Sequence, residues 1–87
     1  MFNIYQIKEN AEKINEIKLF PNPSEGMVTL ESSVKGILKI YDVIGKIIKQ
    51  EELIPGTNSI HIDNPGIYFV TVQYEDYYRT FKLIIQK

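Results

Sequence analysis

Hydrophobic and polar residues alternate in short runs along most of the chain from residue 17 onward. Val28 and Leu30 alternate with polar neighbours in one run, and Ile60 and Ile62 do so in another. Strict alternation places the hydrophobic side chains on one face of the backbone, as in a β-strand that has one buried side. The pattern therefore predicts strands that share a hydrophobic core.

Turn-forming residues separate these runs at intervals of roughly eight to twelve residues, which is typical of β-sandwiches and β-barrels. The turns are rich in glycine, proline and asparagine, and they lie at 22–26, 32–36, 42–45, 55–56 and 64–66. We therefore predict an all-β domain. Its seven strands are expected near residues 17–20, 27–31, 36–42, 46–52, 57–62, 66–74 and 77–86.

Two of these segments permit a more detailed prediction. Tyr68, Val70 and Val72 share one face of a run that is β-branched and aromatic almost throughout, which favours a central strand. Residues 42–45 are typical of a hairpin loop. There, Gly45 can supply the positive φ that a type I turn followed by a bulge requires.

Residues 1–16 differ from the rest of the chain. Ala11 and Ile14 are spaced as on one face of a helix, among several charged residues, but we favour a linker or the remnant of an upstream domain. The start of the chain lacks the basic residues and apolar centre of a signal peptide. We therefore expect the signal for the first membrane to lie on a longer parent chain, and we assign the domain itself to residues 17–87.

The composition favours one folded domain and argues against nucleic acid or a membrane as a partner. The chain has 87 residues, of which 44% are hydrophobic, enough for one small core. Its net charge is −1 with both signs interspersed, so neither nucleic acid nor an anionic membrane surface is an expected partner. There is no cysteine for a disulfide framework and no apolar run long enough for direct membrane insertion.

Catalytic and cofactor sites have little support in the sequence. His61 is the only histidine, and the alternation around it places it on the outward face of a strand with no nucleophile beside it. Asp42, Asp63 and Asp76 fall at predicted strand ends, where they could bind calcium, but turn capping explains them more simply. We therefore predict a protein that is not an enzyme and binds no cofactor or metal.

A cluster of tyrosines leaves a second type of function open. Tyr74, Tyr77 and Tyr78 surround the last predicted turn and could form a stacking platform for carbohydrate. Tyrosine is also common on strands because its ring packs while its hydroxyl stays in water, and the sequence has no tryptophan to accompany the cluster. An adhesive or carbohydrate-binding module remains the alternative to the interpretation given next.

Four blocks of residues occur in a fixed order along the chain. They are Pro21, Asn22, Pro23 and Gly26 in the first turn; Tyr41, Asp42, Gly45 and Lys46 around the predicted hairpin; Gly66, Ile67 and Tyr68 before the central strand; and Lys82, Leu83 and Lys87 in the tail. No single block is specific, but the ordered set is. Over roughly residues 18 to 87 it resembles the type A C-terminal sorting domain of the type IX (Por) secretion system.

The resemblance implies an immunoglobulin-like antiparallel β-sandwich of seven strands that acts as a secretion signal. Its partners would be a covalently joined upstream cargo, the type IX machinery that carries the cargo from the periplasm across the outer membrane of a Gram-negative bacterium, and a surface signal peptidase that then removes the domain. The cargo would be secreted or held at the cell surface. Within the domain we expect the tail, with Lys82 and Lys87, to be the recognised element.

Overall fold

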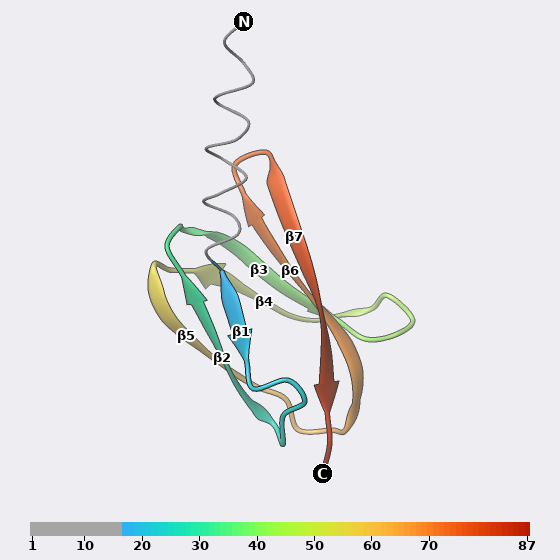
Figure 1. Cartoon of the computed structure of the whole chain (residues 1–87). Coiled ribbons are helices and arrows are strands. Elements are labelled where there is room, and N and C mark those ends of the chain that lie inside the picture. Colours follow the sequence, from blue (N-terminus) through green and yellow to red (C-terminus); the bar gives the residue numbers. More distant parts are fainter. Residues whose placement is uncertain (1–16) are drawn as a thin grey trace, which may run out of the picture.

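The computed structural model describes residues 17–87, which fold into seven β-strands (Figure 1). The predicted linker or short helix in residues 1–16 lies outside the described residues. Within residues 17–87 there is no helix of the length and apolar character needed to cross a membrane. The strands are β1 (Lys18–Phe20), β2 (Met27–Ser32), β3 (Gly36–Tyr41), β4 (Ile47–Leu53), β5 (Gly56–His61), β6 (Gly66–Tyr74) and β7 (Tyr77–Ile85).

The strands form two antiparallel sheets that pack face to face, as the sequence predicted. One sheet has the order β1-β2-β5 and the other has the order β4-β3-β6-β7, so β6 lies in the interior of its sheet. In antibody constant domains the fourth strand joins the sheet of the first, second and fifth strands. Here β4 pairs with β3 instead, which is a variation within the immunoglobulin-like sandwich.

The core lies between the sheets and is built from the alternating positions. Leu30, Val70, Val72 and Leu83 have no exposed surface, and every strand except the short β1 contributes at least one buried side chain. Because side chains alternate along a strand, each strand has an inward and an outward face. Residues that are paired across neighbouring strands lie on the same face of the sheet, so the register also shows which residues face the core. The buried hydrophobic residues are Ile17, Val28, Leu30, Val34, Leu38, Ile40, Leu53, Ile60, Ile62, Tyr68, Val70, Val72, Leu83 and Ile85.

The predicted hairpin connects β3 and β4. Gly45 has φ of +89°, as a turn followed by a bulge requires, and its backbone N–H donates to the carbonyl of Asp42 over 3.0 Å. The Asp42 N–H in turn donates to the carbonyl of Lys46 over 3.0 Å. The register shifts by one residue between Ile40 and Tyr41, where the bulge begins. The sequence prediction of this turn is therefore confirmed.

Candidate recognition surface

Segments that are far apart in the sequence meet at one end of the sandwich (Figure 1). The register pairs Ile67 at the start of β6 with Ile84 near the end of β7, and Tyr41 at the end of β3 with Phe69. The connection between β1 and β2 also lies here, hydrogen-bonded to the last residues of the chain. We call this region the tail end. The first-turn, β6 and tail blocks of the motif meet there, and the β3–β4 hairpin projects from its side.

Asn22 joins the first turn to the last strand. Its Nδ2 donates to the carbonyl of Lys82 over 2.7 Å, and its Oδ1 accepts from the N–H of Ile84 over 3.0 Å. Both of the peptide bonds that precede Pro21 and Pro23 are cis. An asparagine amide has one donor side and one acceptor side, so it can replace two bonds of a missing neighbouring strand. Asn22 therefore occupies part of the free edge of β7.

The backbone of Ser24 continues this contact along the same edge. The Ser24 N–H donates to the Ile84 carbonyl over 2.9 Å, and the Ser24 carbonyl accepts from the Gln86 N–H over 2.7 Å. Ser24 and Ile85 form an isolated parallel bridge. An open strand edge presents unpaired N–H and C=O groups to other chains. The first turn therefore covers this edge of β7 from Lys82 to Gln86.

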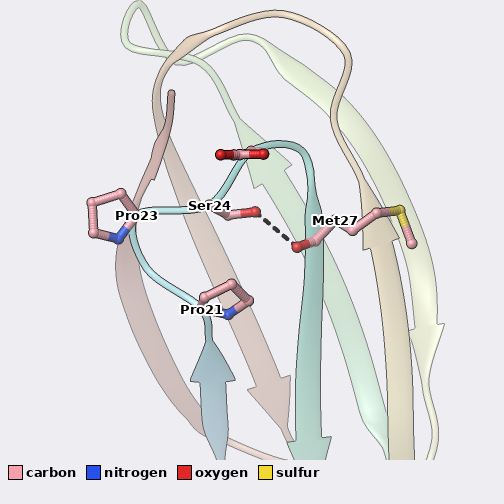
Figure 2. A pocket seen from close by; sticks show the side chains of 5 residues that line it. Pro21, Pro23, Ser24 and Met27 are labelled. Carbon is pink, nitrogen blue, oxygen red and sulfur yellow. Dashed lines mark hydrogen bonds between the residues drawn. The ribbon is translucent and has the colours of Figure 1, made fainter. Parts of the chain in front are cut away.

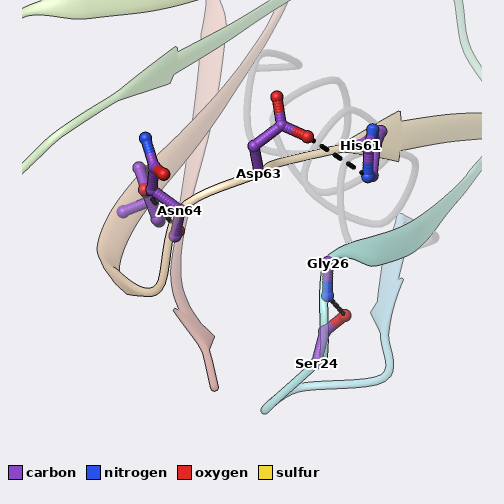
Figure 3. Close-up of polar contacts among 6 residues, drawn as sticks. Ser24, Gly26, His61, Asp63 and Asn64 are labelled. Carbon is purple, nitrogen blue, oxygen red and sulfur yellow. Dashed lines mark hydrogen bonds and ion pairs between the residues drawn. The ribbon is translucent and has the colours of Figure 1, made fainter. Parts of the chain in front are cut away.

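The first turn is fixed by its own hydrogen bonds as well. The buried Ser24 hydroxyl donates to the Met27 carbonyl over 2.7 Å (Figure 2) and accepts from the Gly26 N–H over 3.0 Å (Figure 3). Gly26 has φ of +134°, and a Cβ there would lie 3.1 Å from the Ile62 carbonyl oxygen and 3.4 Å from the Lys87 side chain. Glycine is therefore required by conformation and by space. A pocket on the outside of the turn is lined by Pro21, Pro23, Ser24, Glu25 and Met27.

Asp42 caps the hairpin that projects beside the tail end. Its Oδ1 accepts from the N–H of Ile44 over 3.1 Å and from the N–H of Lys46 over 2.9 Å. These contacts, together with the backbone bonds from Asp42 N–H to Lys46 and from Gly45 N–H to Asp42, hold the loop in one conformation. The tip carries Val43 and Ile44, which are 63% and 83% exposed. The role of Asp42 seen here is turn capping.

Tyr68 fixes the connection that leads into β6. It is buried against the core, and its hydroxyl donates to the Asn64 carbonyl over 2.7 Å. In immunoglobulin-like sandwiches a tyrosine near the start of the sixth strand often bonds to the backbone a few residues upstream, an arrangement called the tyrosine corner. Tyr68 has this position and this bond. Gly66, with φ of +150°, turns the chain just before it.

The tail residues divide between core and solvent. Leu83 and Ile85 are 0% and 2% exposed and face the other sheet, whereas Lys82 and Lys87 are exposed. Alternation along β7 places Lys82 on the opposite face of the sheet from Leu83 and Ile85, whereas Lys87 lies beyond the end of the strand. Leu83 is therefore a core residue, and the exposed charged side chains within residues 82–87 are those of Lys82 and Lys87.

The remaining candidates from the sequence do not form a catalytic or metal site in the structure. His61 lies on the outward face of β5, with its Nε2 3.5 Å from Asp63 Oδ1; the two side chains are 57% and 81% exposed (Figure 3). Asp42 is used in the turn, and Asp76 lies in the β6–β7 turn. Across residues 17–87 no group of three histidine, cysteine or acidic residues is placed to hold a metal ion.

The three tyrosines of the possible carbohydrate platform do not share a face. Tyr74 and Tyr77 are paired across the β6–β7 hairpin and pack against the core, whereas Tyr78 is 65% exposed. Tyr78 follows Tyr77 directly in β7, so the two rings point to opposite sides of the sheet. This arrangement gives no support to a stacking platform of three rings.

The structure adds residues that the motif comparison did not single out. Ser24 is buried in the first turn, and Phe69 and Ile84 lie on the outer face of their sheet at the tail end. The sequence does contain a pattern that indicates the outward positions of Phe69 and Ile84. The runs around Phe69 and Ile84 are apolar at consecutive positions, so these strands carry apolar side chains on both faces.

The family comparison agrees with this geometry. Residues 18–86 match the model of the secretion system C-terminal sorting domain, which covers β1 to the end of β7 and all but the last of the motif residues. No curated protein sequence matches the chain. Three of the four motif blocks meet at the tail end, and the match spans most of the chain, so the protein belongs to the C-terminal sorting domains of the type IX secretion system.

Proposed function

We propose that this domain is a non-catalytic secretion signal that directs an upstream cargo through the type IX machinery and across the outer membrane, and that a surface peptidase then removes it. The domain would correspond to residues 17–87, with cleavage upstream of β1. The exported cargo would reach the cell surface or the medium after passing through the periplasm.

The observation that carries this proposal is the connection between the first turn and the tail. Asn22 and Ser24 bond to the backbone of β7 between Lys82 and Gln86, although these residues are about 60 positions apart in the sequence. The first turn thus holds the tail strand in place, and Lys82 and Lys87 lie in solvent. A domain that must present its C-terminal strand to a receptor benefits from such preorganisation.

The direct test is export of a reporter. Residues 17–87, which include the buried Ile17, are fused behind a periplasm-directed reporter in a cell with type IX secretion and in a matched strain that lacks the translocon. We expect surface or extracellular reporter in the first strain and periplasmic reporter in the second. If the reporter stays periplasmic in the secretion-competent cell, the proposal is wrong and an adhesive module that stays attached to its parent becomes the better interpretation.

The role of the tail is tested by a variant that leaves the core intact. Deleting residues 82–87 would remove Leu83 and Ile85 from the core, so loss of export could follow from unfolding. The double variant Lys82→Ala, Lys87→Ala removes only exposed charges, and Lys18→Ala, Lys35→Ala is a matched control on exposed lysines elsewhere. We expect equal melting temperatures and loss of export in the tail variant alone. Equal export of the two variants would show that the tail lysines are not recognised.

A further inference from the structure

An apolar strip crosses the outer face of the four-stranded sheet at the tail end. In β6 the core residues alternate with Ile67 and Phe69, which therefore point away from the other sheet. The register then extends this outer face to the neighbouring strands, because Ile67 pairs with Ile84, and Tyr41 pairs with both Phe69 and Ile47. We call this set the outer stripe: Tyr41, Ile47, Ile67, Phe69 and Ile84.

The outer stripe is apolar where a solvent-facing sheet would ordinarily be polar. Ile47 and Ile67 are 45% and 40% exposed, and the other three side chains are partly exposed. Farther along the same face the paired residues become polar: Thr71 pairs with Thr80, and their hydroxyls are 3.4 Å apart. An antiparallel sheet with one solvated face normally alternates in this polar manner. A contiguous apolar region at one end of that face indicates an interaction surface.

Positive charge borders the outer stripe. Lys82 is paired with Phe69, and Lys39 lies two residues before Tyr41 on the same face of β3. The nearest acidic residue on this face, Glu52, is paired with Ile37 at the opposite end of β3. A surface with an apolar centre and a cationic rim is complementary to one with an apolar centre and carboxylates around it.

We propose that the outer stripe is the surface by which the domain docks on a protein of the secretion machinery, at a site that presents aliphatic side chains surrounded by carboxylates. This inference rests on the proposed function. The apolar side chains share one sheet face with Lys39 and Lys82, which suits contact with a protein surface that carries carboxylates better than insertion into lipid. Interface cores typically consist of apolar and aromatic residues within a polar rim.

The chain contains a closely matched control for this surface. Ile37 is on the same face of the same sheet and is 39% exposed, against 40% for Ile67, but it lies at the end away from the tail. Ile67→Thr and Ile37→Thr make the same chemical change at equally exposed strand positions, and threonine is well suited to strands. For charge, Lys82→Glu is compared with Lys18→Glu, an exposed residue of the other sheet.

The four variants are measured in the 87-residue chain by thermal unfolding and, as reporter fusions, by export. We expect similar melting temperatures within each pair, and export lowered about tenfold for Ile67→Thr relative to Ile37→Thr, as expected for loss of one well-packed interface side chain. Lys82→Glu should lower export more than Lys18→Glu. Equal export within the isoleucine pair, with the unaltered fusion exported, would overturn the outer stripe while leaving the sorting function intact.

Lack of export of the unaltered fusion would instead overturn the sorting function and, with it, this inference. A lipid surface is tested separately by flotation of the 87-residue chain with vesicles of phosphatidylcholine and phosphatidylglycerol. We expect no binding. Binding that Ile67→Thr abolishes and Ile37→Thr preserves would show that the outer stripe contacts lipid, and would contradict docking on a protein.

Discussion

Replacing Asn22 by alanine should loosen the edge of β7 without disturbing the core. The change removes the bond from Nδ2 to the Lys82 carbonyl and the bond from Oδ1 to the Ile84 N–H, at 2.7 and 3.0 Å. Asn22 is exposed, so water can replace both partners after the substitution. The Ser24 backbone bonds to Ile84 and Gln86 do not depend on this side chain. The expected effect is therefore local and moderate.

The magnitude follows from the two bonds. Each intramolecular hydrogen bond contributes about 0.5–1.5 kcal/mol net, so their loss should lower the free energy of unfolding by about 1–2 kcal/mol at this solvated site. For a domain of this size, that corresponds to a fall in melting temperature of about 4–16 °C. Asn58 provides an internal scale. Its buried amide bonds to the Leu30 carbonyl and to both backbone groups of Ile54, so Asn58→Ala should lower the free energy of unfolding more than Asn22→Ala does.

Amide hydrogen exchange provides the decisive assay. In Asn22→Ala the Ile84 amide should exchange faster by a factor larger than the global loss of stability explains, because its hydrogen-bond partner is gone. Amides of β6 should change only by the global amount. Asn64→Ala is the control, since Asn64 is also exposed and bonds to Tyr68 through its backbone carbonyl. Unchanged relative protection of Ile84, or an equal effect of Asn64→Ala, would refute the bridging role of Asn22.

Three further substitutions test the turns and the core, each by thermal unfolding. Gly45→Val should destabilise the domain by at least about 1 kcal/mol because it forces a β-branched residue to a φ of +89°, whereas the exposed His61→Ala should stay within about 0.5 kcal/mol; equal melting shifts would contradict this. Gly36→Ala should lower the free energy of unfolding by about 1–3 kcal/mol or more, because its Cβ would clash with the Gln73 carbonyl oxygen; an unchanged melting temperature would rule out the close approach of β3 to β6. Tyr68→Phe should lower the free energy of unfolding by about 0.5–1.5 kcal/mol through loss of the 2.7 Å bond to the carbonyl four residues upstream; an unchanged melting temperature would show that the tyrosine corner does not stabilise the fold.

The local elements of this fold could be predicted from the sequence because their causes are local. Alternation in segments such as 27–31 assigned Val28 and Leu30 to the buried face, and Gly45 marked the hairpin. Both signals depend on residues within a few positions of each other. Adjacent positions in a strand also point to opposite faces, so the separation of Tyr77 from Tyr78 was available from the same pattern.

The contacts between distant segments could not be predicted in the same way. The partners of Asn22 lie 60 and 62 positions away, and no local pattern specifies which strand edge a turn will meet. The pairing of β4 with β3 rather than with the other sheet likewise depends on how the sheets close around the core. The family motif marked Asn22 and its neighbours as a set, but the physical connection between them required the structure.

The covered edge of β7 limits how a partner protein can recognise the tail. Peptide recognition by strand addition needs free N–H and C=O groups along an edge. At the tail end those groups are already bonded to Asn22 and Ser24, from the Lys82 carbonyl to the Gln86 N–H. A partner strand would first have to displace the first turn and would gain no net hydrogen bonds there. Recognition of the folded domain at this end would therefore rely on side chains, which makes the exposed lysines and the outer stripe the features to vary first.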